Sequence, residues 1–400
     1  MKKPYTFSIQ GRDLSLNKEV KFEIEDFTIE IIHRQNEPEN ALRIQVEREN
    51  LKVELLPSKG LSVGEVFIND VPIFWDPPTD LIDPDKLNLV SSEILVNHRE
   101  IDGFTFLKTF LGGIEFYGMK NWGMPRTDET TGELYLLHGE TSNIPVEQVT
   151  GALYDDRLEL SGIFIYRNFD FISGKPWYNS GEPLYEITNT IVIPKSGSSI
   201  KAIAKVRNIT NETMQPDWGY HITFRPEDGS RLIVPSKSVK NRANDKVPDD
   251  FEIWHPAKNP QIRTETGIIH LGLKLYVENN KPVNKSLMLY PSGRGICVSS
   301  PPSPYFQTWF CHGGANSTEF SYAETGDPVF KKNWDVQGIE PGSSALDYNG
   351  VIDSNVVFKK YLAPDESFEN EVEIEVLSEE QADLLYKDIM DYNKSRTSMI

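Results

Sequence analysis

The run Tyr185-Glu-Ile-Thr-Asn-Thr-Ile-Val-Ile193 has Tyr185, Ile187, Ile191 and Ile193 at alternate positions. Because successive side chains of a β-strand point to opposite faces, this period predicts a strand with one buried and one polar face. The same period recurs along the chain, in residues 20–24, 27–31, 42–46, 51–55, 269–277 and 368–376. These alternating runs predict an all-β protein, built as a large antiparallel β-sandwich.

One segment near the C-terminus has a helical period instead. Ser378 is followed three residues later by Gln381, which is the pattern of an N-terminal capping box. Apolar side chains then follow at helical spacing, at Ala382, Leu385, Ile389 and Tyr392. We therefore expect a short C-terminal helix and a frayed polar tail within residues 378–400.

The alternating runs favour one large β-domain at residues 46–377, because no linker composition interrupts them. Residues 1–45 are predicted as an N-terminal strand extension packed on this domain, where they could cover a sheet edge or form a homodimer contact. Residues 97–148 and 299–350 are rich in Gly, Pro and aromatic residues and lack a clear period. They are predicted as two long, functional loops.

Charge and composition narrow the classes of partner. The chain has 41 Lys and Arg against 60 Asp and Glu, a formal net charge of −19. This acidic field repels nucleic acid and anionic membranes, so we expect neither as a partner and favour a neutral small molecule. The pattern of residues leads us to expect neither a secretory signal nor a membrane-spanning run of about 20 apolar residues. The two cysteines, Cys297 and Cys311, form no metal-binding or disulfide pattern, which favours a cytoplasmic location.

Two of the seven histidines stand in unusual surroundings. His138 precedes Gly139, whose conformational freedom allows a sharp turn. His221 lies in an alternating run at a predicted strand end, close to Asp217 and Trp218. The remaining histidines considered have ordinary contexts, and we expect exposed or turn positions for them: His33, His98, His255 and His270.

One acidic residue also stands out. Glu340 follows Ile339 and precedes Pro341-Gly342, which predicts a carboxylate at the abrupt end of a strand. Two histidines and one glutamate could serve as acid and base groups, or could together bind a metal ion. The sequence leaves both readings open.

Several short motifs resemble the galactose mutarotase-like superfamily, in the aldose 1-epimerase family. The resemblance covers about residues 45–375, and His138, His221 and Glu340 follow the family's order. It implies a supersandwich fold with a sugar bound on one sheet. The motifs are residues 55–73, 112–123, 137–143, 218–224 and 337–342.

The resemblance also implies a reaction, the interconversion of sugar anomers through ring opening. Glu340 would be the base at the anomeric hydroxyl, His221 the acid at the ring oxygen, and His138 a hydrogen-bonding group near that oxygen. Neither a metal nor an organic cofactor is required. The region that corresponds to the family's Asn-Arg pair reads Met119-Lys-Asn-Trp-Gly123 here, so either Lys120 or Asn121 could take the place of the pair, or neither could. The remaining candidate substrate-binding residues are Asn143, Asp217 and Trp309, the last as a stacking platform or as part of the core.

Two other functions fit the same motifs. A carbohydrate-binding protein without turnover would keep the aromatic and polar groups but would not need Glu340 as a base. A different enzyme on the same fold, such as a lyase or a metal-dependent isomerase, would use the His and Glu side chains in another way.

Overall fold

The computed structural model describes residues 4–10, 20–32, 41–77, 81, 83–85, 106–127, 134–169, 176–259, 264–313, 334–343, 353–354 and 356–399. Its strands form two large sheets whose strand pairs are antiparallel apart from one parallel pair near the C-terminus, which confirms the predicted all-β sandwich. The chain forms two compact units. Unit 1 comprises Met1–Trp218 and Lys359–Asn370, and unit 2 comprises Gly219–Phe358 and Glu371–Ile400.

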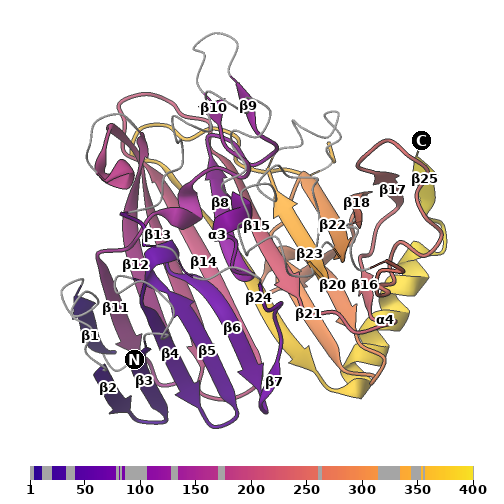
Figure 1. Cartoon of the computed structure of the whole chain (residues 1–400), viewed down its shortest axis with the longest axis horizontal. Coiled ribbons are helices and arrows are strands. Elements are labelled where there is room, and N and C mark those ends of the chain that lie inside the picture. Colours follow the sequence, from indigo (N-terminus) through magenta and orange to yellow (C-terminus); the bar gives the residue numbers. More distant parts are fainter. Residues whose placement is uncertain are drawn as a thin grey trace. The chain divides into compact units, whose positions relative to one another are not determined.

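The first sheet of unit 1 arises from the alternating runs near the N-terminus. Its strand order is β2-β3-β4-β5-β6-β8, with β7 paired to β6. Figure 1 shows β4, β5 and β6 side by side. The bounds are β2 (Val20–Ile24), β3 (Phe27–Ile32), β4 (Arg43–Arg48), β5 (Leu51–Leu56), β6 (Ser62–Ile68), β7 (Val71–Pro72) and β8 (Gly113–Met119).

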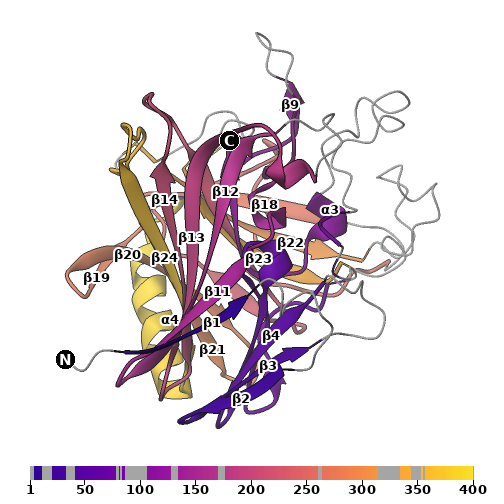
Figure 2. The ribbon, with the colours of Figure 1, turned by 90° about the vertical axis from the view of Figure 1, so that its left-hand side faces the viewer.

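The second sheet of unit 1 packs on the first, and Figure 2 shows β11–β13 and β2–β4 as separate layers. Gly60 has a φ of 60°, and a Cβ there would lie 3.2 Å from the Phe164 ring of the opposite sheet. Asn189 Nδ2 donates to the Gly60 carbonyl at 2.6 Å. The strands are β1 (Tyr5–Gln10), β11 (Gln148–Leu153), β12 (Arg157–Asn168), β13 (Glu182–Pro194) and β14 (Ser199–Asn208).

Short elements of unit 1 connect these strands. The 3₁₀ turn η1 (Pro57–Lys59) joins β5 to β6, and η2 (Thr141–Asn143) precedes β11. The remaining short elements are α3 (Phe106–Thr109), β9 (Arg126–Thr127), β10 (Leu134–Tyr135) and η3 (Trp177–Asn179).

In unit 2, one sheet has the order β15-β23-β22-β18-β17-β25. These strands are β15 (Asp217–Phe224), β23 (Val336–Gly342), β22 (Tyr305–His312), β18 (Thr264–Leu271), β17 (Ser238–Asn241) and β25 (Thr397–Met399). The other sheet has the order β24-β21-β20-β16, with β19 on β20. Its strands are β24 (Ser367–Leu377), β21 (Gly295–Ser300), β20 (Lys281–Leu289), β16 (Arg231–Ile233) and β19 (Leu275–Glu278).

The predicted C-terminal helix is confirmed as α4 (Glu379–Asn393), drawn in yellow in Figure 1. Ser378 and Gln381 form the reciprocal capping box. Ile389 of the helix packs with Ile233 and Leu287 of the β24-β21-β20-β16 sheet. Burial of these apolar side chains stabilises a helix that would be marginal in isolation.

Three predictions about secondary structure are wrong. Residues 269–277 do not form one strand, because the chain turns at Gly272 (φ 63°) between β18 and β19. The tail after Asn393 is not simply frayed, since β25 pairs in parallel with β17. The two predicted long loops contain β8, β22 and β23, whose side chains are buried along almost their whole length. Strands buried on both faces have no polar alternation to reveal them.

Within the described ranges, no helix has both the length and the apolar character needed to cross a bilayer. The predicted domain boundaries at residues 45/46 and 377/378 stay a prediction.

Candidate functional site

The pairing of β15, β23 and β22 places a set of polar residues on one face of the unit 2 sheet. In register, Gly338 of β23 lies between Thr223 of β15 and Trp309 of β22. Glu340 lies opposite Gln307 in the neighbouring row. Since every second residue of a strand shares a face, these residues point the same way. We call this set the Glu340 face: His221, Thr223, Gln307, Trp309, Gly338 and Glu340.

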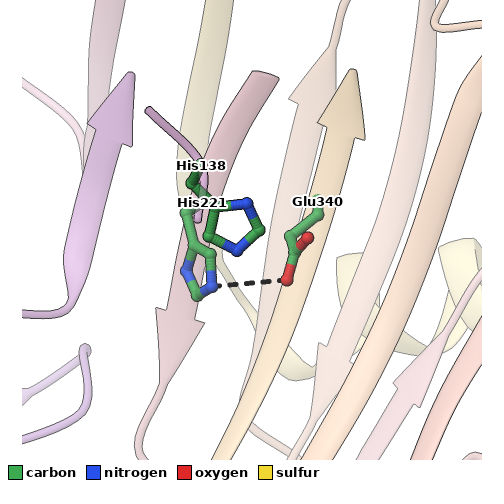
Figure 3. Close-up of side chains that lie close together, drawn as sticks. All are labelled: His138, His221 and Glu340. Carbon is green, nitrogen blue, oxygen red and sulfur yellow. Dashed lines mark ion pairs between the residues drawn. The ribbon is translucent and has the colours of Figure 1, made fainter. Parts of the chain in front are cut away.

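The side chains of His221 and Glu340 lie within contact distance of each other at the centre of this face. Figure 3 shows the two side chains on neighbouring strands, with His221 Nε2 3.3 Å from Glu340 Oε1. Gln307 Nε2 donates to the other carboxylate oxygen at 2.5 Å. Only 2 % of His221 and 3 % of Glu340 is exposed. The carboxylate is therefore held by a neutral amide and by a ring that can gain or lose a proton.

Burial raises the pKa of Glu340 to about 7, because the ionised carboxylate loses its hydration. The hydrogen bond from Gln307 and the charge of Arg242 lower the pKa, and the charge of Glu265 raises it. These opposing effects leave burial dominant. Near neutral pH, Glu340 is present in both protonation states, as a group that transfers protons must be.

Trp309 lies over Gly338. A Cβ at residue 338 would lie 2.2 Å from Trp309 Nε1 and 2.4 Å from Cε2, so only glycine leaves room for the indole. The Trp309 ring is 5.2 Å from the His221 ring, measured between centroids, and Trp309 is 6 % exposed. The predicted stacking platform thus lies beside His221, while its stacking role stays a prediction.

His138 belongs to unit 1 and sits in a turn between β10 and η2. Its φ is 55°, and its amide donates to the Gly123 carbonyl at 3.0 Å. His138 Nδ1 lies 2.6 Å from the Trp122 carbonyl oxygen. Since that oxygen can only accept, Nδ1 carries the proton, and Nε2 holds the lone pair when the ring is neutral.

The predicted substrate-binding residues of unit 1 make hydrogen bonds within that unit. Asp217 Oδ2 accepts from the Trp122 amide at 2.7 Å, next to the contact with His138. Asn121 Nδ2 donates to backbone carbonyls, including that of Leu136 at 2.8 Å. Lys120 Nζ donates to Asn168. These contacts fix the turns that carry His138, and a role of these residues in substrate binding stays a prediction.

Asn143, the remaining predicted binding residue, joins a buried network in unit 1. Lys59 Nζ donates to Asn143 Oδ1 at 2.9 Å and lies 3.2 Å from Glu115 Oε2. Tyr117 also donates to Glu115, and the Leu111 amide donates to its other oxygen at 3.1 Å. We call Lys59, Glu115, Tyr117 and Asn143 the Lys59 cluster. Burial lowers the pKa of Lys59, against the effect of Glu115.

Two positional predictions are wrong. Glu340 and His221 lie inside β23 and β15 rather than at strand ends, because Pro341 and Gly342 continue to pair with β22. His270, expected to point outward, is 1 % exposed and contacts Ser236 Oγ and Thr308 Oγ1. Burial lowers its pKa to about 3, which keeps it neutral.

His255, predicted to lie in a turn before Pro256, is exposed, and its Nδ1 pairs with Asp228 Oδ1 at 2.7 Å. His33 and His98 lie outside the described residues. Sequence reasoning missed Gln307 and Thr223, although both stand two residues from a predicted site residue. Recognising β22 as a strand would have placed Gln307 on the same face as Trp309.

Comparisons with known proteins agree with this architecture. The model of a protein family, a domain of unknown function (DUF4432), matches residues 39–309, which include both histidines of the predicted site and end before Glu340. No curated protein has a significantly matching sequence.

Solved structures share the fold at low sequence identity. A protein provisionally named as an aldose 1-epimerase from Klebsiella pneumoniae subsp. pneumoniae is 17 % identical, with a TM-score of 0.70 over 98 % of this chain and 94 % of that one. A galactose mutarotase-like protein from Clostridium acetobutylicum is 15 % identical, with a TM-score of 0.53 over 89 % of this chain and 100 % of that one. The chain thus has the galactose mutarotase-like fold and belongs to the DUF4432 family.

Proposed function

We propose that this protein is a sugar 1-epimerase that interconverts the anomers of a neutral free aldose or sugar derivative. The observation that carries the proposal is the buried pair of His221 and Glu340, with Glu340 at a pKa of about 7. An acid and a base that exchange one proton near neutral pH are the minimum for this reaction. The acidic net charge of −19 favours a neutral substrate.

The proposed reaction begins with Glu340 as carboxylate and His221 as imidazolium. Glu340 removes the proton of the anomeric hydroxyl as the bond between the anomeric carbon and the ring oxygen breaks. His221 gives its proton to the ring oxygen, and an open-chain aldehyde results. Rotation about the neighbouring carbon–carbon bond turns the other face of the carbonyl toward the hydroxyl that was the ring oxygen. Ring closure then reverses both proton transfers and gives the other anomer.

By the order of residues in the family resemblance, we propose that His138 also contacts the sugar. Its tautomer constrains how. With Nδ1 donating to the Trp122 carbonyl, a neutral ring can only accept through Nε2, so it would bind a sugar hydroxyl. A hydrogen bond from His138 to the ring oxygen would require the imidazolium form.

Saturation-transfer NMR of free aldoses at anomeric equilibrium tests this function. Wild-type protein should exchange α and β resonances faster than the spontaneous rate. Glu340→Gln should reduce this excess rate by about 10²–10⁴-fold, the usual contribution of general acid–base catalysis. The matched control is Gln337→Met, since Gln337 is on the same strand but its side chain points to the opposite face and accepts from Ser230.

The same experiment with a chelator distinguishes metal-dependent chemistry. A nitrogen of His221 and an oxygen of Glu340 are both atoms that bind metal ions. Exchange that disappears with chelator and returns with a divalent metal would replace the proposed mechanism. Binding of a sugar without any exchange would identify a carbohydrate-binding protein.

A further inference from the structure

Three polar atoms of the Glu340 face are shielded from water and yet have no hydrogen-bond partner within the described part of the chain. They are Thr223 Oγ1, Gln307 Oε1 and Trp309 Nε1. Thr223 and Gln307 are 0 % exposed and Trp309 is 6 % exposed. Unpaired buried groups are costly and therefore uncommon in native proteins. Three of them on one face need a reason.

Their positions follow from the strand register. Thr223, Gly338 and Trp309 occupy one row across β15, β23 and β22. Gln307 stands in the adjacent row, opposite Glu340. The indole crosses above Gly338, which brings its Nε1 edge over the middle strand. The three atoms thus share one face and two adjacent rows with the acid–base pair.

The hydrogen-bonding character of the three atoms selects a chemical class of ligand. Trp309 Nε1–H can only donate, Gln307 Oε1 can only accept, and the Thr223 hydroxyl can do either. A ligand whose groups both donate and accept satisfies all of them, and hydroxyl groups have this property. A carboxylate or phosphate would instead oppose the oxygen of Gln307 and bring negative charge toward Glu340.

We propose that Trp309 Nε1, Thr223 Oγ1 and Gln307 Oε1 bind the hydroxyl groups of a neutral sugar and so determine which substrate the site accepts. The inference rests on the proposed function, because it assigns further contacts to the same site. It gives Trp309 a role through its N–H group, which is separate from stacking. Gln307 has two roles, since its amide nitrogen holds Glu340 while its oxygen faces the ligand.

Binding measurements on two conservative variants test these contacts. Trp309→Phe keeps an aromatic ring over Gly338 but removes the N–H, and Thr223→Val replaces the hydroxyl by a methyl group of similar size. Isothermal titration would use D-galactose, D-glucose, D-mannose and D-xylose, with D-galacturonate as the charged probe. Each variant should bind the preferred neutral sugar about 10- to 100-fold more weakly, and galacturonate should bind more weakly than galactose.

Gln337→Met is the matched control. Gln337 Nε2 also lacks a partner among the described residues, but it lies on the opposite face of β23. Gln337→Met should leave the sugar affinity unchanged, because the unpaired atom of Gln337 does not lie on the Glu340 face. A weaker affinity would mean that any unpaired buried atom has this effect, whichever face it lies on. Thermal melting of every variant separates a lost contact from a lost fold.

The outcomes distinguish this inference from the proposed function. Affinity unchanged in both Trp309→Phe and Thr223→Val, or tighter binding of galacturonate, overturns the inference even if wild-type protein exchanges anomers. Weakened binding in the variants, with no exchange by wild type, supports the inference and overturns the epimerase. Wild-type protein that binds none of the four neutral sugars overturns both.

Discussion

Glu115 and Glu340 are both almost completely buried, but their surroundings differ in kind. Glu115, in the Lys59 cluster of unit 1, contacts an ammonium group, a phenol and a backbone amide. Glu340, on the Glu340 face of unit 2, contacts a carboxamide and an imidazole. The first arrangement surrounds the carboxylate with a cation and fixed donors. The second leaves it free to exchange a proton, as the proposed role of Glu340 requires.

The largest expected effect on stability concerns Glu115 and its partner Lys59. Lys59→Met removes the cation beside Glu115 and leaves a buried, uncompensated charge. We expect the free energy of unfolding to fall by about 3–5 kcal/mol, as measured by urea denaturation. Adding Glu115→Gln to the same chain should restore most of the loss. If the single variant is as stable as wild type, Lys59 does not compensate a buried charge of Glu115 in the folded protein.

Removal of the Glu340 carboxylate should have the opposite effect on the free energy of unfolding. The pKa of Glu340 lies near 7 against 4.5 for an ordinary glutamate, so the folded state binds more protons than the unfolded state between these pH values. The free energy of unfolding of wild type therefore falls as pH rises through this interval. Glu340→Gln lacks this titration and should gain about 3 kcal/mol relative to wild type between pH 4 and pH 8.

Denaturation curves of both proteins at several pH values measure this gain. The control is Gln337→Met, which replaces a buried, neutral side chain of the same strand and so removes no titrating group. The difference in stability between that variant and wild type should be the same at every pH. A constant difference between Glu340→Gln and wild type would mean that Glu340 titrates normally.

The rate of anomer exchange should follow the same titration. If the carboxylate form of Glu340 is the base, the excess rate over spontaneous exchange falls about tenfold for each pH unit below 7, or about 100-fold at pH 5. NMR exchange measurements at low sugar concentration report this dependence for the free enzyme. A flat profile between pH 5 and pH 7 would remove Glu340 from the role of base.

The smallest expected effect concerns Asn143, which the sequence suggested as a substrate-binding residue. Its side chain accepts from Lys59, so Asn143→Ala should lower the free energy of unfolding by about 1 kcal/mol, or somewhat more because the donor is charged. The KM for the sugar should not change. A raised KM with unchanged stability would mean that Asn143 contacts the substrate and that the Lys59 cluster takes part in substrate binding.

The sequence predicted strands such as β3, β4 and β13, because each has one buried and one polar face. The strands β8, β22 and β23 were missed for a physical reason. In β23, Gln337 and Glu340 are polar but buried, and Gly338 and Pro341 are usually turn residues. Neither period nor composition marks such a strand, although it carries the candidate base.

The candidate site was predicted in part. The ion pair of His221 and Glu340 follows from residues that the sequence singled out. Gln307 could not be found without the register of β22 and β23, because its position opposite Glu340 is a property of the paired strands. The burial that raises the pKa of Glu340 likewise depends on the whole fold.

The division into units has a consequence for experiments that cut the chain. The boundary at residues 218/219 falls inside β15, and that at residues 370/371 falls inside β24. Each unit is assembled from two separate segments, so no single truncation isolates either one. Paired strands are also poor protease substrates, because a protease needs an extended and accessible backbone. Fragments made by truncation would therefore break a sheet, and the roles of the two units are better separated by point substitutions.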